Sequence, residues 1–147
     1  SEARLYELKF KDSWHAENSD LQPLTEKNIP LLRIVKSQLE EYFLGKRKKF
    51  DIPLCPSGTR FQTLAWNALS GIPFGQTSNY QNQASSIGRP KAVRAIGTAN
   101  GANPICIILP CHRVIAKNGT LSGYAGGLIR KKFLLQHEGI NIPTGAR

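Results

Sequence analysis

The sequence lacks the features of a secreted, metal-bound or membrane-spanning protein. Its 147 residues include only three cysteines, Cys55, Cys106 and Cys111, and no CxxC pair. An odd number of cysteines cannot all pair as disulfides, and these isolated ones do not have the spacing of a zinc module. No apolar run approaches the roughly 18 residues of a membrane span, and the first residues contain no signal-peptide core. The sequence thus predicts reduced thiols and a soluble protein of the cytoplasm, or of the nucleus in a eukaryote.

Acidic residues are nearly absent from the second part of the chain. Residues 51–147 carry ten Lys and Arg but only two acids, Asp51 and Glu138, whereas residues 1–50 carry ten basic and eight acidic residues. Most of the net charge of +10 therefore lies after residue 50. A basic surface can simply be solvated. However, each retained carboxylate would repel phosphates, so this depletion favours binding to nucleic acid.

A loop with several prolines and glycines coincides with the change in charge. It reads GKRKKFDIPLCPSGT over residues 45–59 and separates an expected structural domain, residues 1–54 with the linker, from a second domain, residues 55–147. In the first domain, YELKF (residues 6–10) alternates as a strand does. Residues 29–45 predict a helix with proline in its first turn and glycine as its stop. The basic run within the loop fits a solvated linker better than a phosphate site.

The second part of the chain predicts several short helices. A capping box, TRFQ at residues 59–62, begins the first, and a second S-x-x-Q signal at residues 78–81 begins another that ends at Gly88. A third helix begins at Pro90. Two short helices around a glycine turn form a helix-turn-helix, although any helical hairpin gives the same pattern. The expected fold is α+β, with a small N-terminal α/β domain before a mainly helical domain that contains a helix-turn-helix and a cysteine-bearing strand.

The second helix of this motif has an unusually bare outer face. Val93 and Ile96 can face inward, which leaves small residues outward beside Lys91 and Arg94: Ala92, Ala95, Gly97 and Ala99. A helix that reads the major groove usually carries long hydrogen-bonding side chains, so a bare helix with one arginine suits the minor groove. An alanine-rich packed helix explains this segment equally well.

A cysteine follows an uninterrupted apolar run in NPICIILPCHRV, residues 103–114. The five apolar residues Ile105–Leu109 lie between two prolines and predict a buried strand that ends near Cys111. A hairpin signal, Asn118-Gly119, comes next, and residues 128–139 predict a helix stopped by glycine.

The thiol of Cys111 and the imidazole of His112 are candidates for chemistry. A lone cysteine after a strand is most often a small buried apolar residue. A thiol becomes a nucleophile when it is held as a thiolate, which His112 could bring about in an acid-poor region if another group orients the imidazole.

Taken together, the motifs resemble those of the O6-alkylguanine-DNA alkyltransferases, also called methylated-DNA–protein-cysteine methyltransferases. The resemblance runs from Gly58 to Gly139 and consists of these segments in the family's order: GTRFQTLAWNAL, IPFGQ, Tyr80, GRPKAVRAIGTANGANP, ILPCHRVI, GYAGG and LLQHEG. Residues 1–50 look like the family's N-terminal domain but carry no motif of their own.

The resemblance implies a role for each of several residues. Cys111 would be the acceptor thiol, His112 would take its proton through a water, and Glu138 would hold the other imidazole nitrogen. Asn103 would connect the helix-turn-helix to the active-site strand by hydrogen bonds. Tyr80 would push the target nucleotide out of the stack and donate to the flipped base.

The remaining implied residues would contact DNA or the base. Arg94 would fill the gap left in the duplex, with small residues of the same helix, Ala92, Ala95 and Gly97, against the DNA. The guanine pocket would be lined by the backbone of Val114 and by Tyr124 and Ala125.

The implied activity is single-use repair. The protein would bind double-stranded DNA through the minor groove, flip O6-alkylguanine out and transfer the alkyl group irreversibly to Cys111. It would act as a monomer, with no cofactor and no membrane partner. Family members that bind zinc use N-terminal Cys and His residues, and residues 1–54 offer only His15, so no metal site is expected. Two positions depart from the family: Gln83 stands where leucine is usual, and Cys106 where proline is frequent.

Three other classes of protein remain open from the sequence. A cysteine hydrolase would also use Cys111 and His112, but it would turn over repeatedly and leave the helix-turn-helix unexplained. A non-catalytic lesion sensor would replace the acceptor cysteine, which this chain keeps. A transcription factor would need base-edge contacts that the bare helix does not offer.

Overall fold

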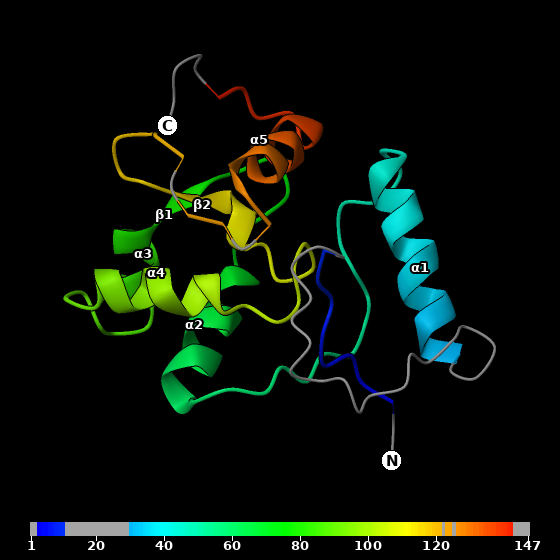
Figure 1. Cartoon of the computed structure of the whole chain (residues 1–147), viewed down its shortest axis with the longest axis horizontal. Helices are drawn as coiled ribbons and strands as arrows, with labels where there is room; N and C mark the ends of the chain where they lie inside the picture. Colours follow the sequence, from blue (N-terminus) through cyan, green and yellow to red (C-terminus); the bar gives the residue numbers. More distant parts are fainter. Residues whose placement is uncertain (1–2, 11–29, 122, 125, 143–147) are drawn as a thin grey trace.

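The computed structural model describes residues 3–10, 30–121, 123, 124 and 126–142. In chain order these form α1 (Pro30–Phe43), α2 (Arg60–Leu69), β1 (Ser78–Asn79), α3 (Tyr80–Ser86), α4 (Val93–Gly101), the 3₁₀ helix η3 (Cys111–Arg113), β2 (Val114–Ile115) and α5 (Leu128–His137). The two short strands pair in parallel. Helices α2, α3 and α4 group together, while α1 stands on the opposite side of the molecule (Figure 1). The expected α+β class is confirmed, and no described helix is long and apolar enough to span a membrane.

Helix α1 forms within the predicted bounds, but not all of its apolar residues are buried. It ends before Gly45, whose φ of +78° favours glycine. Two of its apolar residues, Ile34 and Phe43, are 47% and 43% exposed. Gln38 is buried instead, because its amide exchanges hydrogen bonds with both backbone groups of Asp51, at 3.2 and 2.9 Å.

The first described segment contacts both halves of the chain. The expected strand over residues 6–10 is reduced to two isolated parallel bridges, Leu5 with Leu54 and Leu8 with Ile105. The core also crosses the predicted boundary, since Leu5 and Val35 pack in the same buried cluster as Trp66 and Ile105. The division at residues 54 and 55 stays a prediction.

The helix-turn-helix forms with small shifts from the predicted ends. The capping box at residues 59–62 is confirmed. Helix α3 is capped by Asn79 rather than Ser78, because the Asn79 side chain accepts the amide of Asn82 at 2.8 Å. Helix α4 begins at Val93 rather than Pro90, since residues 89–92 form a turn.

The inner face of α4 includes one residue that the sequence placed outside. Ala99 is 2% exposed and packs with Ala65, Ala84 and Ile96, because it lies one helical turn after Ile96. Its carbonyl accepts the indole of Trp66 at 2.8 Å. The other small residues of this helix that were expected outside do not belong to this buried cluster.

The strand predicted over Ile105–Leu109 is wrong. The run is largely buried, but it turns, and Ile107 has a φ of +73°, which is rare for a β-branched residue. Turn bonds satisfy its backbone, including Leu109 N to Ile105 O at 3.1 Å. The cysteine therefore begins the 3₁₀ helix η3 instead of ending a strand.

The predicted hairpin at Asn118-Gly119 is only a tight turn. Gly119 has a φ of +84°, and Ala116 donates to Thr120 at 3.1 Å. The strand before the turn, β2, pairs with β1 rather than across the turn. The final helix, α5, ends as predicted before Gly139.

Gln83, the departure from the family's usual leucine, ties the three helices together. It is buried on α3, and its amide exchanges hydrogen bonds with the Asn100 amide of α4, at 2.9 and 2.8 Å. The same nitrogen donates to the carbonyl of Ala65 on α2 at 3.0 Å. Both polar atoms of the Gln83 side chain therefore have hydrogen-bond partners within the three helices.

We predict that Gln83→Leu destabilises the protein by about 1–3 kcal/mol, because the Asn100 amide loses its buried partner. The double variant Gln83→Leu/Asn100→Leu should recover part of that loss, since it removes both polar groups. Urea unfolding of the three proteins measures both effects. A single variant as stable as the wild type would contradict the assigned pairing.

Candidate active site

A pocket of about 610 Å³ opens between α3, α4 and the segment after β2. It brings together five residues that the sequence singled out, since Tyr80, Arg94, Gly97, Cys111 and Tyr124 all line it. Ala92 and Ala95 instead line a neighbouring groove with Phe61 and Lys91. Ala125 lies outside the described residues.

Cys111 is held at the pocket by Asn103. The thiol is 4% exposed, and Asn103 Nδ2 lies 3.1 Å from its sulfur and 2.8 Å from the carbonyl of Leu109. The Asn103 oxygen accepts the amide of Ile105 at 3.0 Å. Because Asn103 closely follows the end of α4, these bonds connect the helix-turn-helix to the cysteine, as the resemblance implies for this residue.

His112 and Glu138 form a fully buried pair behind the cysteine. Nε2 of His112 lies 2.7 Å from Oε2 of Glu138. Burial lowers the pKa of His112, although the bond and the charge of Glu138 act in the opposite direction, so the imidazole is neutral. Because an ionised carboxylate can only accept, Nε2 is assigned as the donor to Glu138, which leaves the Nδ1 lone pair of the neutral imidazole available. In the described part of the chain Nδ1 has no protein hydrogen-bond partner.

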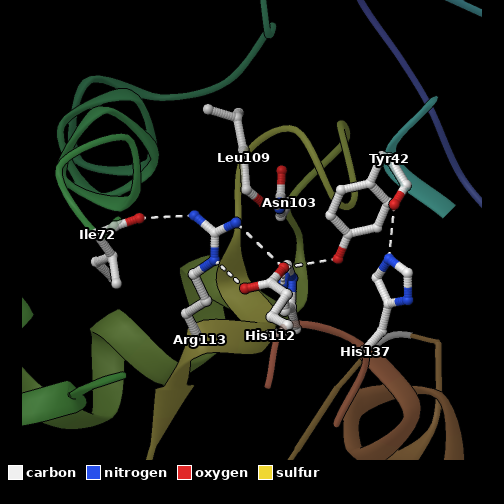
Figure 2. Close-up of polar contacts among 8 residues, drawn as sticks. Tyr42, Ile72, Asn103, Leu109, His112, Arg113 and His137 are labelled. Atoms are coloured by element: carbon white, nitrogen blue, oxygen red, sulfur yellow. Dashed lines mark hydrogen bonds and ion pairs between the residues drawn. The ribbon is translucent and has the colours of Figure 1, made fainter. Parts of the chain in front are cut away.

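The carboxylate of Glu138 is surrounded by donors. Arg113 Nε donates to Oε1 at 2.7 Å and Nη2 to Oε2 at 3.1 Å, and Tyr42 donates to Oε2 at 2.6 Å. Arg113 and Tyr42 lie on opposite sides of His112 in Figure 2, and Arg113 also donates to the Ile72 carbonyl. Burial raises the pKa of Glu138, but its bonds to His112 and Arg113 outweigh burial and lower the pKa to about 2.

The sequence suggested a thiol held as thiolate, and the structure corrects this for the resting protein. Burial raises the pKa of the Cys111 thiol more than the Asn103 hydrogen bond and the charge of Lys131 lower it. The protonated thiol is therefore the resting form, and a thiolate has to be generated by transfer of its proton to a base.

Three residues of the site were missed from the sequence: Tyr42, Arg113 and Lys131. Lys131 is buried on α5, and Nζ donates to the carbonyls of Val114 and Gly123 at 2.7 and 3.3 Å. Burial lowers its pKa to about 8. The sequence does contain a signal for Arg113. Glu138 is the one acidic residue after residue 51, so a buried cation in this part of the chain has one acidic partner available.

Two family models match the chain. One, described as 6-O-methylguanine DNA methyltransferase, DNA binding domain, matches residues 60–140, and the other, described as the ribonuclease-like domain of the same protein, matches residues 1–56. The chain belongs to the 6-O-methylguanine DNA methyltransferase family. The resemblance stated from the sequence is thereby confirmed.

Relatives and solved structures agree with this assignment. A methylated-DNA–protein-cysteine methyltransferase of Methanosarcina acetivorans is 50% identical over 132 residues, which cover 90% of this chain and 78% of the relative. The structure of Mycobacterium tuberculosis O6-methylguanine methyltransferase has a TM-score of 0.78 at 42% identity and covers 89% of this chain and 77% of its own. Mycobacterium tuberculosis OGT in complex with DNA has a TM-score of 0.71 at 50% identity, with 72% and 66% covered. The enzyme class expected from the sequence, a methylated-DNA–protein-cysteine methyltransferase, is confirmed by these relatives.

We predict that Glu138→Gln lowers the stability at pH 7 by about 3 kcal/mol, the free energy that corresponds to lowering the carboxyl pKa from 4.5 to about 2 on folding. Because the folded-state pKa is depressed, this contribution is complete above about pH 4.5 and is lost as the pH falls towards 2. The difference in stability between the wild type and the variant should therefore become smaller in acid when urea unfolding is measured between pH 7 and 3.

A surface acid provides the control for this measurement. Glu7 pairs with Lys9 at 2.7 Å, but both side chains are partly exposed, so Glu7→Gln should cost less than about 1 kcal/mol. A Glu138 variant that lost no more than the Glu7 variant would contradict the account of the buried carboxylate.

Proposed function

We propose that this protein repairs O6-alkylguanine in double-stranded DNA by moving the alkyl group onto the sulfur of Cys111. The observation that carries the proposal is the placement of Cys111 in a pocket formed with α4, with a neutral, carboxylate-bound His112 directly after it in η3. A nucleophile, a base and an orienting carboxylate are thus assembled beside a helix-turn-helix.

The outer face of α4 supports a DNA surface. A Cβ added to Gly97 would meet no protein atom within 4 Å, so packing within the chain does not require a glycine there. Ala95 and Arg94 are exposed on the same helix. A bare helix allows close approach to the minor groove, and Arg94 can fill the space that an extruded base leaves. The Mycobacterium tuberculosis OGT complex with DNA adds support at 50% identity.

The chemistry follows from the buried groups. The damaged base leaves the stack at a cost of a few kcal/mol and enters the pocket beside Tyr80 and Tyr124. The Cys111 proton passes to Nδ1 of His112 through a water, and Glu138 stabilises the imidazolium. The thiolate attacks the alkyl carbon, the carbon–O6 bond breaks, and its electron pair stays on the guanine, which is stabilised by hydrogen bonds from Tyr80 and backbone amides.

Each molecule reacts once on this proposal. The product is a thioether, and none of the described groups can return the sulfur to a thiol. The reaction needs no cofactor or metal, and the protein acts as a monomer in the compartment that holds the DNA, the cytoplasm or a nucleus. A cysteine hydrolase, the main alternative, would release its product and turn over.

We predict that incubation with a duplex containing O6-methylguanine adds one methyl group per protein molecule, on Cys111. Intact mass and peptide mapping measure this, and Cys111→Ala should gain no mass. Cys55 and Cys106 serve as internal controls. More than one turnover per molecule, or a methyl group on another residue, would reject the single-use assignment to Cys111.

We predict that Gly97→Leu weakens binding to duplex DNA about tenfold or more, because the side chain holds α4 away from the groove. The fold should not suffer, since glycine inside a helix costs roughly 0.5–1 kcal/mol relative to alanine. Anisotropy with an undamaged duplex and thermal melting measure the two effects. Asn67→Leu, at an exposed position of α2, is the matched control and should bind as the wild type does. Unchanged affinity of the Gly97 variant would argue against α4 as the DNA surface.

A further inference from the structure

A residue of α1 reaches the buried pair behind the cysteine. Tyr42 has no exposed surface, and its hydroxyl lies 2.6 Å from Oε2 of Glu138, 96 positions later in the chain. Its backbone carbonyl accepts Nε2 of His137 at 2.6 Å. One residue of the N-terminal part therefore binds two consecutive residues at the end of α5, and Figure 2 shows Tyr42 and His137 on the side opposite Arg113.

Tyr42 and His112 share one oxygen of the carboxylate. Oε2 of Glu138 lies 2.7 Å from His112 Nε2 and 2.6 Å from the Tyr42 hydroxyl. Burial and the bond to Glu138 raise the pKa of Tyr42, so the phenol keeps its proton and is the donor. A hydrogen bond to a carboxylate stabilises its charge and reduces its pull on other protons. The strength of the Glu138–His112 interaction therefore depends on Tyr42.

We propose that Tyr42 is a positioning residue for alkyl transfer, which fixes the Glu138 carboxylate and limits how strongly it holds a proton on His112. The proposal rests on the function proposed above. As a consequence, His112 stays neutral and able to accept the Cys111 proton over a wider pH range. Without the Tyr42 hydroxyl, the carboxylate would hold a proton on His112 up to a higher pH.

Other charges near His112 act alongside Tyr42. Arg113 of η3 binds Glu138 directly, and both Arg113 and Lys131 of α5 lower the pKa of His112 by their positive charge. Tyr42 is the group on α1 that acts on this pair, and its hydroxyl can be removed without changing any formal charge. This makes its effect separable from theirs.

The ring of Tyr42 has a packing role that the test must leave intact. It contacts Phe43, Phe50, Phe74 and His137 with ring centroids 4.9–6.2 Å apart. Tyr42→Phe keeps this ring and removes only the hydroxyl. Phe50→Leu is the matched control, because it trims the packing on Tyr42 and belongs to no polar contact of the site.

The experiment is the rate of methyl transfer to Cys111 as a function of pH, with a methylated duplex and with free O6-alkylguanine. In Tyr42→Phe, His112 should be protonated more readily, so the loss of rate in acid should begin about one pH unit higher, a tenfold change in that equilibrium. Both substrates should show the same shift, because Tyr42 acts on the chemistry and not on DNA binding. Phe50→Leu should lower the melting temperature and keep the wild-type pH profile.

Two results would overturn the inference: an unchanged pH profile in Tyr42→Phe, or an equal shift in Phe50→Leu. Either is distinguishable from failure of the proposed function, in which the wild type itself would transfer no methyl group to Cys111.

Discussion

The buried carboxylate of Glu138 is the interaction on which the rest of the site depends. An ionised group in a protein interior is tolerated only where charges and hydrogen bonds compensate for the lost water. Here the compensation comes from Arg113, His112 and Tyr42, which bind its two oxygens from η3 and α1. The same bonds favour one tautomer of His112, and on the function proposed above this prepares the base beside the cysteine.

The two parts of the chain also contact one another away from this carboxylate. Leu5 and Leu8 bridge to the linker and to the run before Cys111, and Val35 shares a core with Trp66. The N-terminal part thus packs against the turn before Cys111, and its Tyr42 donates a hydrogen bond to the carboxylate of Glu138. The sequence predicted a structural role for residues 1–54, and the hydrogen bond from Tyr42 to Glu138 is a contact that this prediction did not include.

The features that the sequence predicted correctly are those set by residues close together along the chain. The capping box at residues 59–62 and the stop at Gly139 are local signals, and the helices formed where these signals placed them. The prediction of a strand over Ile105–Leu109 was wrong because an apolar run indicates burial but does not show whether a partner strand is available. Within this run only Ile105 forms a bridge, with Leu8. The hydrogen bonds of Tyr42 with Glu138 and of Gln83 with Asn100 join residues distant in sequence, and no periodicity identifies them.

Glu138 is the one acidic side chain after residue 51, and it lies inside the protein. Every side-chain charge that residues 52–147 present to solvent is therefore positive. These positive charges attract the phosphates of any duplex, whatever its sequence. On the function proposed above, attraction is separated from discrimination: charge supplies the encounter, and the shape of α4 and the adjoining pocket supplies the discrimination.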